Sequence, residues 1–350
     1  ADVVLGIGSN RIIIDAIRRS LEGERVTAFG PKEDLSLEGE RVLAGPPYTA
    51  YVKLAEGCDN RCSYCAIPLI RGDFRSRPME NILEECRELA AQGVKELNLV
   101  AQDTSRYGLD LYGEYRLPQL IDQVCEIDGV HWVRVLYCYP DRITDALMET
   151  MARQPKVCKY IDIPVQHGSA RVLQEMNRTG DADTILALVR RLRERIPGVA
   201  VRTTLIAGFP GETQEDFAQL CRLVEEGRFD RLGCFAYSQE EGTPAGERED
   251  QVDEAVRARR ADAIMELQMK VAFDLAQQQK GKTLKVLVEG REEDLWVGRS
   301  YMDAPDIDTR VYFQGPESLA PGDFVWVAID GARDYDLTGT YCAPEEGDGR

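Results

Sequence analysis

The chain has 350 residues and a formal net charge of −18, which makes it a poor electrostatic match for nucleic acid and a better one for a basic partner. No apolar run approaches the roughly 18 residues of a membrane-spanning helix, so we expect no membrane association. A chain of this length can bury its own core. Because we find no secretory signal, its ten cysteines are expected to stay reduced in the cytoplasm.

The first fifty residues suggest one small βα unit, with a buried strand over residues 3–8 and a helix over residues 12–21. From residue 51 to about 238, short β-rich runs alternate with amphipathic stretches such as 79–91 and 213–227, the latter closed by a glycine. The expected strands are 51–55, 95–101, 132–137, 159–164, 200–206 and 232–237. This alternation predicts an α/β fold, an incomplete (βα)6 TIM-like barrel with its chemistry at the C-terminal ends of the strands.

The last hundred residues change character. Residues 252–279 have the periodicity of one long helix that Gly281 ends, and residues 282–341 alternate like strands separated by Gly and Pro turns. The strands recognised there are 284–288, 309–313 and 324–329. We therefore expect a small C-terminal all-β barrel as a separate module.

Cys58, Cys62 and Cys65 form a C-x3-C-x2-C motif directly after the first expected strand of the sheet. An iron–sulfur cube has four irons, so three cysteines leave one iron open to another ligand. A structural zinc site needs four closed ligands, and the two histidines, His131 and His167, lie singly and far downstream. The motif therefore favours a 4Fe-4S cluster over zinc, and the other seven cysteines are interpreted mostly as packing residues.

This loop, with the aromatic Tyr64 before its last cysteine, resembles the radical S-adenosylmethionine (SAM) enzymes. The resemblance implies that the amino and carboxylate groups of SAM bind the open iron and that Tyr64 belongs to the cofactor site. It also implies that an electron from the cluster cleaves SAM to a 5′-deoxyadenosyl radical, which removes a hydrogen atom from an unactivated carbon.

Polar and glycine-rich loops follow the second, fourth and fifth expected strands. The candidate SAM-binding residues in these loops are Gln102, Asp103, Thr104, Gln166, His167, Ser169, Gly208, Phe209 and Gly211. Taken alone, Asp103 or Thr104 is equally consistent with a helix cap, and a single histidine is more often a local hydrogen-bonding residue. The glycines allow the backbone to approach a flat ligand closely, as an adenine and ribose shelf requires.

The combination of motifs resembles the methylthiotransferase branch of the radical SAM superfamily over about residues 48 to 341. The matching stretches are 57–72, 102–108, 164–178, 206–213 and 237–245. The resemblance implies a remnant of an N-terminal methylthiotransferase domain at 1–45, a radical SAM domain at 46–250, a connecting helix at 251–280 and a TRAM domain at 281–345. No catalytic side chain is assigned.

The resemblance also implies a second cluster on three further cysteines in the N-terminal domain. Residues 1–57 contain no cysteine, so we expect this chain to lack most of that domain. We accordingly expect it to bind SAM and cleave it reductively, but not to complete methylthio transfer.

Two substrates compete: an aspartate of the twelfth small-subunit ribosomal protein, modified at its β-carbon, and a tRNA adenosine. Residues 281–350 contain 15 acidic and 7 basic residues, a net charge of 7 − 15 = −8, whereas a module that grips tRNA should be basic. This acidity favours the basic ribosomal protein, with Asp303, Asp306 and Asp308 expected on the docking surface. An electron donor protein is the other expected partner.

Overall fold

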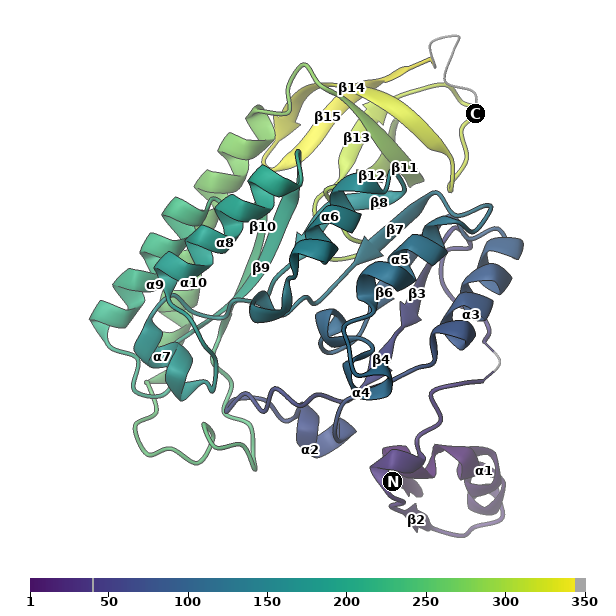
Figure 1. Ribbon diagram of the computed structural model, residues 1–350, viewed down its shortest axis with the longest axis vertical. Coiled ribbons are helices and arrows are strands. Elements are labelled where there is room, and N and C mark those ends of the chain that lie inside the picture. Colours follow the sequence, from purple (N-terminus) through teal and green to yellow (C-terminus); the bar gives the residue numbers. More distant parts are fainter. Residues whose placement is uncertain (40, 344–350) are drawn as a thin grey trace.

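The computed structural model describes residues 1–39 and 41–343. Figure 1 shows three parts: a small N-terminal lobe, a central α/β domain, and a C-terminal barrel at the opposite end of the molecule from the lobe. No helix in the described part of the chain has the length and apolar character needed to cross a bilayer.

The N-terminal lobe consists of a parallel strand pair and one α-helix. Strand β1 (Val3–Leu5) pairs with β2 (Val26–Ala28), and α1 (Ile13–Leu21) connects them after the 3-10 turn η1 (Ile7–Ile12). The expected strand is therefore three residues shorter than predicted, whereas the helix lies where its periodicity placed it. A second turn, η2 (Lys32–Asp34), contacts the central domain, because Arg75 donates to the carbonyl oxygens of Lys32 and Glu33.

The central domain contains the six predicted strands in one open parallel sheet. In chain order the strands are β3 (Thr49–Lys53), β6 (Glu96–Val100), β7 (Trp132–Val135), β8 (Val157–Asp162), β9 (Ala200–Ala207) and β10 (Arg231–Ala236). Their order in the sheet is β10-β9-β8-β7-β6-β3, and every neighbouring pair is parallel. Because β3 and β10 do not pair with each other, the sheet is an incomplete barrel, as predicted.

Helices cover the outer face of this sheet and bury its main apolar core (Figure 1). They are α3 (Met79–Ala91), α4 (Leu109–Tyr112), α5 (Leu117–Cys125), α6 (Asp145–Arg153), α7 (Ala170–Glu175), α8 (Ala182–Arg195) and α9 (Gln214–Gly227). Thr213 begins α9 with a capping box that it shares with Asp216. The prediction that a glycine closes this helix is wrong. Gly227 is still helical, and the residue after it, Arg228, has the left-handed backbone conformation, with φ 43°.

The long helix α10 (Glu254–Gln277) leads from the sheet to a closed five-stranded barrel. The barrel strands are β11 (Thr283–Glu292), β12 (Leu295–Ser300), β13 (Val311–Gln314), β14 (Phe324–Arg333) and β15 (Asp336–Cys342). Sequence patterning did not identify β12 and β15 as strands. Five consecutive residues of β12 are buried, so its sequence lacks the in-and-out alternation that would have revealed it.

The barrel packs against the sheet face that the helices leave free, at the N-terminal ends of the strands. Its Phe313 and Val286 share an apolar cluster with Trp132 of β7 and Tyr160 of β8. Strand ends on this side also supply Glu96, which accepts hydrogen bonds from Arg299 of the barrel.

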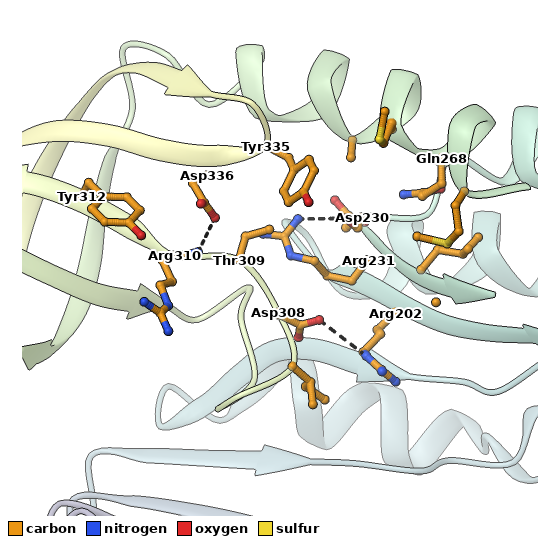
Figure 2. A pocket seen from close by; sticks show the side chains of 16 residues that line it. Arg202, Asp230, Arg231, Gln268, Asp308, Thr309, Arg310, Tyr312, Tyr335 and Asp336 are labelled. Carbon is orange, nitrogen blue, oxygen red and sulfur yellow. Dashed lines mark hydrogen bonds and ion pairs between the residues drawn. The ribbon is translucent and has the colours of Figure 1, made fainter. Parts of the chain in front are cut away.

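The structure of the loop between β12 and β13 contradicts the prediction that its three aspartates form an acidic docking surface. Asp303 pairs with Arg231 at 2.5 Å and is 1% exposed, and Asp308 lies 3.5 Å from Arg202 with a side chain that is 3% exposed. Figure 2 shows Asp308 directed at Arg202 beneath helix α10. These two aspartates are counter-ions for arginines of the sheet, so they cannot dock a partner; of the three, only Asp306 is exposed.

Candidate cluster and cofactor site

The cysteine loop leaves the sheet through a turn that only glycine can form. It lies between the short strands β4 (Ala55–Glu56) and β5 (Arg75–Ser76), beyond the C-terminal end of β3. Gly57 has φ 76°, and a Cβ atom added there would lie 2.2 Å from the carbonyl oxygen of Asp73. The chain therefore doubles back closely enough for the amide of Cys58 to donate to Gly72 at 3.1 Å.

Cys58, Cys62 and Cys65 are free, half-buried thiols in this one loop. The amide of Cys65 donates to the carbonyl oxygen of Cys62 at 3.0 Å, which closes a tight turn between them. Burial is the main cause that raises the pKa of Cys58 to about 11 and that of Cys65 above its usual value. These two thiols must therefore lose their protons when a metal binds.

The donor set fits a three-cysteine cluster better than a single ion. A structural zinc site needs four ligands around one ion, and no group of three or more His, Cys, Asp or Glu side chains in the described residues is placed to hold a single metal ion. Thiolates on three corners of a cube bind three different irons and need no such convergence. The histidine nearest in the fold, His167, is fully buried and bonded to Glu212, so it offers no fourth ligand.

Hydrogen bonds to the loop after β6 and to the end of α7 hold the cysteine loop in position. Asn60 donates to Asp103 at 3.1 Å, and Asn177 donates to the carbonyl oxygens of Asn60 and Arg61. Ser63 donates to the carbonyl oxygen of Glu175 at 2.7 Å. The loop is thus fixed to the ends of β6 and α7 by the protein's own contacts.

Tyr64 and Arg178 lie against the central cysteine. Nη1 of Arg178 is 3.7 Å from Sγ of Cys62, and its guanidinium carbon lies 4.2 Å from the ring centre of Tyr139. Burial raises the pKa of Tyr64 well above its usual value, and the neighbouring Cys62 adds to this rise. Arg178 lies in the 164–178 motif but was not selected from the sequence, because nothing in a linear pattern shows which polar side chain turns toward the cysteines.

After β6, the three predicted residues have different surroundings. Oε1 of Gln102 is buried and has no hydrogen-bond partner among the described residues. Asp103 accepts from Arg142 and from Ser105, and Oγ1 of Thr104 accepts from the amide of Ala101. Gln102 is therefore the one with a free acceptor, and Asp103 and Thr104 hold the loop.

The residues after β8 show the same division. Gln166 has a left-handed backbone, with φ 70°, and its buried Oε1 has no partner within the described structure. Nδ1 of His167 accepts from the amide of Ser169, so its Nε2 carries the proton that faces Glu212 at 3.2 Å. Oγ of Ser169 donates to Asp216 at 2.6 Å.

After β9, Gly208, Phe209 and Gly211 form a tight loop. The pair of His167 and Glu212 supports this loop. Oε2 of Glu212 accepts from the amides of Gly208 and Phe209. A Cβ atom on Gly208 would meet the side chain of Arg257 at 2.5 Å, so on that side the close approach is to this chain's own α10. Phe209 is fully buried and packs edge-on against Tyr237.

Two cavities flank the domain. One of about 310 Å³ adjoins Arg178 and Tyr139 at the end of the strands where the cysteines lie. Another of about 530 Å³ lies between β10, α10 and the C-terminal barrel, lined by residues that include Arg231, Gln268 and Tyr335 (Figure 2). The larger cavity is at the opposite ends of the strands from the cysteine loop, and sequence patterning gave no sign of it.

Comparison with known proteins agrees with this architecture. The sequence profile of the Radical SAM superfamily matches residues 52–224, and that of the TRAM domain matches residues 281–342. The structure of coproporphyrinogen III oxidase from Escherichia coli, a radical SAM enzyme, is similar with a TM-score of 0.51 and 16% identity. The match covers 73% of this chain and 67% of that chain, and it supports the fold alone.

Other known proteins have much higher sequence identity to this chain, and they match almost all of it. It is 49% identical to "Ribosomal protein uS12 methylthiotransferase RimO" of Desulfitobacterium hafniense, over 97% of this chain and 77% of the relative. It is 50% identical to the protein of the same name from Pelotomaculum thermopropionicum, with the same two coverages. The predicted fold class and family are confirmed: the chain belongs to the ribosomal protein uS12 methylthiotransferase family of the radical SAM superfamily, with a C-terminal TRAM domain.

Proposed function

We propose that this transferase acts on the β-carbon of an aspartate in uS12, the twelfth small-subunit ribosomal protein, to which its family attaches a methylthio group. The three-cysteine loop would serve the radical step, and transfer of the methylthio group itself would require the second cluster that the family resemblance implies. The observation that best supports radical SAM chemistry is the three-cysteine loop with no fourth ligand among the described residues. The loops after β6 and β8, at the same end of the sheet, carry two buried carboxamide oxygens that have no hydrogen-bond partner in the described structure. The names of the relatives support the substrate class. The proposed domains are residues 46–250 for the radical SAM domain and 281–345 for the TRAM domain, joined by the helix at 251–280.

Cys58, Cys62 and Cys65 would hold one 4Fe-4S cluster. When bound, the cluster supplies the electron that cleaves SAM to methionine and a carbon radical able to take hydrogen from the substrate. The role of the protein is to keep the cysteine loop rigid. Gly57 forms its turn, and Asn60 and Ser63 bind it to neighbouring elements through hydrogen bonds.

The SAM pocket would lie between the strand ends beside this loop. Oε1 of Gln102 and of Gln166 are buried acceptors without partners among the described residues, and the amino group of SAM carries N–H donors that would satisfy them. Tyr64 would contact the ligand from the cysteine loop, and the backbone at Gly208, Phe209 and Gly211 would form the nucleoside shelf.

Four other predicted residues would act behind this pocket. Asp103 and Thr104 fix the loop after β6, and Ser169 begins helix α7 with its side chain bonded to Asp216. His167 positions the shelf, because Glu212 binds both His167 and the amides of Gly208 and Phe209. We propose these residues as supports of the cofactor site rather than as reacting groups.

The partner would meet an exposed acidic rim of the TRAM domain. Glu293 and Asp334 are exposed and line the same cavity there, and their charge suits a basic ribosomal protein better than nucleic acid. Asp306 is also exposed, but it lies near Tyr51 of β3. The TRAM domain and the cysteine loop lie at opposite ends of the strands, and a six-residue strand spans about 20 Å. A substrate that contacts both must therefore be extended. The ten free cysteines support a reducing cytoplasm, where an electron donor protein would act.

Reductive cleavage of SAM tests the proposal. The chain is reconstituted anaerobically with iron and sulfide and incubated with SAM and dithionite, alone, with purified uS12, or with tRNA. We expect release of 5′-deoxyadenosine and methionine that uS12 stimulates and tRNA does not, and no release from a Cys62→Ala variant. Stimulation by tRNA and not by uS12 would refute the proposed substrate.

Docking is tested by charge reversal on the rim. Glu293→Lys with Asp334→Lys should slow association with uS12 at low salt, because complementary fields chiefly raise the association rate. Glu84→Lys with Glu88→Lys, at two exposed acidic positions on α3, is the matched control, because it changes the net charge by the same amount. Equal slowing by the control would show that net charge, and not this rim, governs the encounter.

A further inference from the structure

Arg178 is a buried cation without a carboxylate partner. Four arginines are buried in the described part of the chain: Arg77, Arg134, Arg178 and Arg299. The other three each form an ion pair with a glutamate, Arg77 with Glu38 and Glu85, and Arg134 and Arg299 with Glu96. No carboxylate oxygen in the described residues lies within ion-pair distance of Arg178, which is 8% exposed. A guanidinium removed from water needs an anion nearby.

The contacts of Arg178 hold its guanidinium group against one sulfur atom, Sγ of Cys62. Its Nη2 donates to the carbonyl oxygen of Pro164 at 2.6 Å, and its plane lies over the ring of Tyr139. These two contacts fix the fork, so that Nη1 lies 3.7 Å from Sγ of Cys62. The ionisable groups beside this guanidinium are the Cys62 thiol and the phenols of Tyr64 and Tyr139. Of these three, the thiol is the one that becomes an anion when the cluster binds.

We propose that Arg178 is a positioning residue that donates an N–H to the Cys62 sulfur and raises the reduction potential of the cluster. The inference rests on the proposed cluster site at Cys58, Cys62 and Cys65. Reduction adds one electron from an external low-potential donor and no proton, so the cluster becomes more negative by one charge. A cation and an N–H at a ligand sulfur stabilise the more negative form and thus favour reduction.

The test is a redox titration of the reconstituted protein, followed by electron paramagnetic resonance. Arg178→Gln removes the charge, and Arg178→Lys keeps the charge but loses the planar fork. Arg191→Gln is the matched control, because Arg191 lines the same cavity, is exposed and pairs with Asp145. We expect Arg178→Gln to disfavour reduction at least tenfold, about 59 mV for one electron, with a smaller change in Arg178→Lys and none in Arg191→Gln.

Two outcomes would overturn the inference: an unchanged potential in Arg178→Gln, or an equal change in Arg191→Gln. A merely structural role for Arg178 would lower stability in urea without shifting the potential. If Arg178→Gln holds no cluster, the comparison of Arg178→Lys with the natural protein decides the question. Absence of iron and sulfide from the natural chain would instead refute the proposed cluster site, so the two failures are distinguishable.

Discussion

Arg299 of the TRAM domain donates to Glu96 of the radical SAM domain at 2.6 Å, and both side chains are almost completely buried. Glu96 also accepts from Arg134 at 3.2 Å, so one carboxylate joins a strand of each domain. Burial alone would raise the pKa of Glu96, but the two guanidinium groups outweigh it and lower the pKa to about 2. The two domains are thus joined through a buried charged group in which one carboxylate binds arginines of both domains.

Removing this carboxylate should loosen the domain junction. Glu96→Gln leaves the buried Arg134 without a carboxylate partner and leaves Arg299 with Glu289 alone, so we expect a loss of about 3–5 kcal/mol in the free energy of unfolding. Urea denaturation measures it. Glu293→Gln, at an exposed position, should change stability by less than about 0.5 kcal/mol. Equal shifts in the two variants would contradict the role of Glu96.

The same carboxylate predicts a specific acid sensitivity. Because the folded pKa of Glu96 lies below its ordinary value of 4.5, its contribution is fully present above pH 4.5 and is lost as pH falls toward about 2. The difference in unfolding free energy between the natural chain and Glu96→Gln should therefore shrink across this range. A difference that stays constant down to the lower limit would disprove the assignment.

The cluster should depend on the three motif cysteines and on no other. Alanine at Cys58, Cys62 or Cys65 should abolish iron and sulfide uptake in anaerobic reconstitution and leave the far-ultraviolet circular dichroism unchanged, because the loop lies outside the apolar core. Cys221→Ala, on α9, is the matched control and should retain the full content. Zinc without labile sulfide in the natural chain would count against the cluster.

The turn at Gly57 should be intolerant of a side chain. Gly57→Ala combines an unfavourable φ of 76° with a contact of 2.2 Å to the Asp73 carbonyl oxygen. Backbone strain alone costs about 1–3 kcal/mol, so we expect the free energy of unfolding to fall by more than this, and cluster uptake to fall as well. Gly93→Ala has a similar φ of 96° but no atom within 4 Å, so it isolates the strain. If both variants lose the same stability and keep the cluster, the close approach is unimportant.

The two unpartnered carboxamides should contribute to SAM affinity. Gln102→Leu and Gln166→Leu should each weaken binding by about 1.5–3 kcal/mol, the contribution of a hydrogen bond to a charged group. Equilibrium dialysis of the anaerobic, reconstituted protein with SAM measures this. Gln268→Leu is the control, since its buried Oε1 also lacks a partner but lines the interdomain cavity. Loss of affinity in the control alone would place SAM elsewhere.

The sequence determined the parts of this protein that local pattern controls. Alternating apolar runs gave all six strands of the sheet, and the amphipathic patterns at 79–91, 213–227 and 252–279 gave helices to within a few residues. The spacing of Cys58, Cys62 and Cys65 indicated the cofactor class, because one short loop contains all three ligands. These features are local, so the linear chain displays them.

Tertiary structure decided what each charged residue does. The composition of the C-terminal segment suggested that Asp303 and Asp308 face a partner, yet both neutralise arginines of a sheet that lies far away in the chain. In the same way, Arg178 gains its position at Cys62 only when the segment after β8 folds onto the cysteine loop. The sequence shows the sign of each charged side chain but not whether that side chain is exposed or buried. Only the packing of the fold shows which charges water can reach.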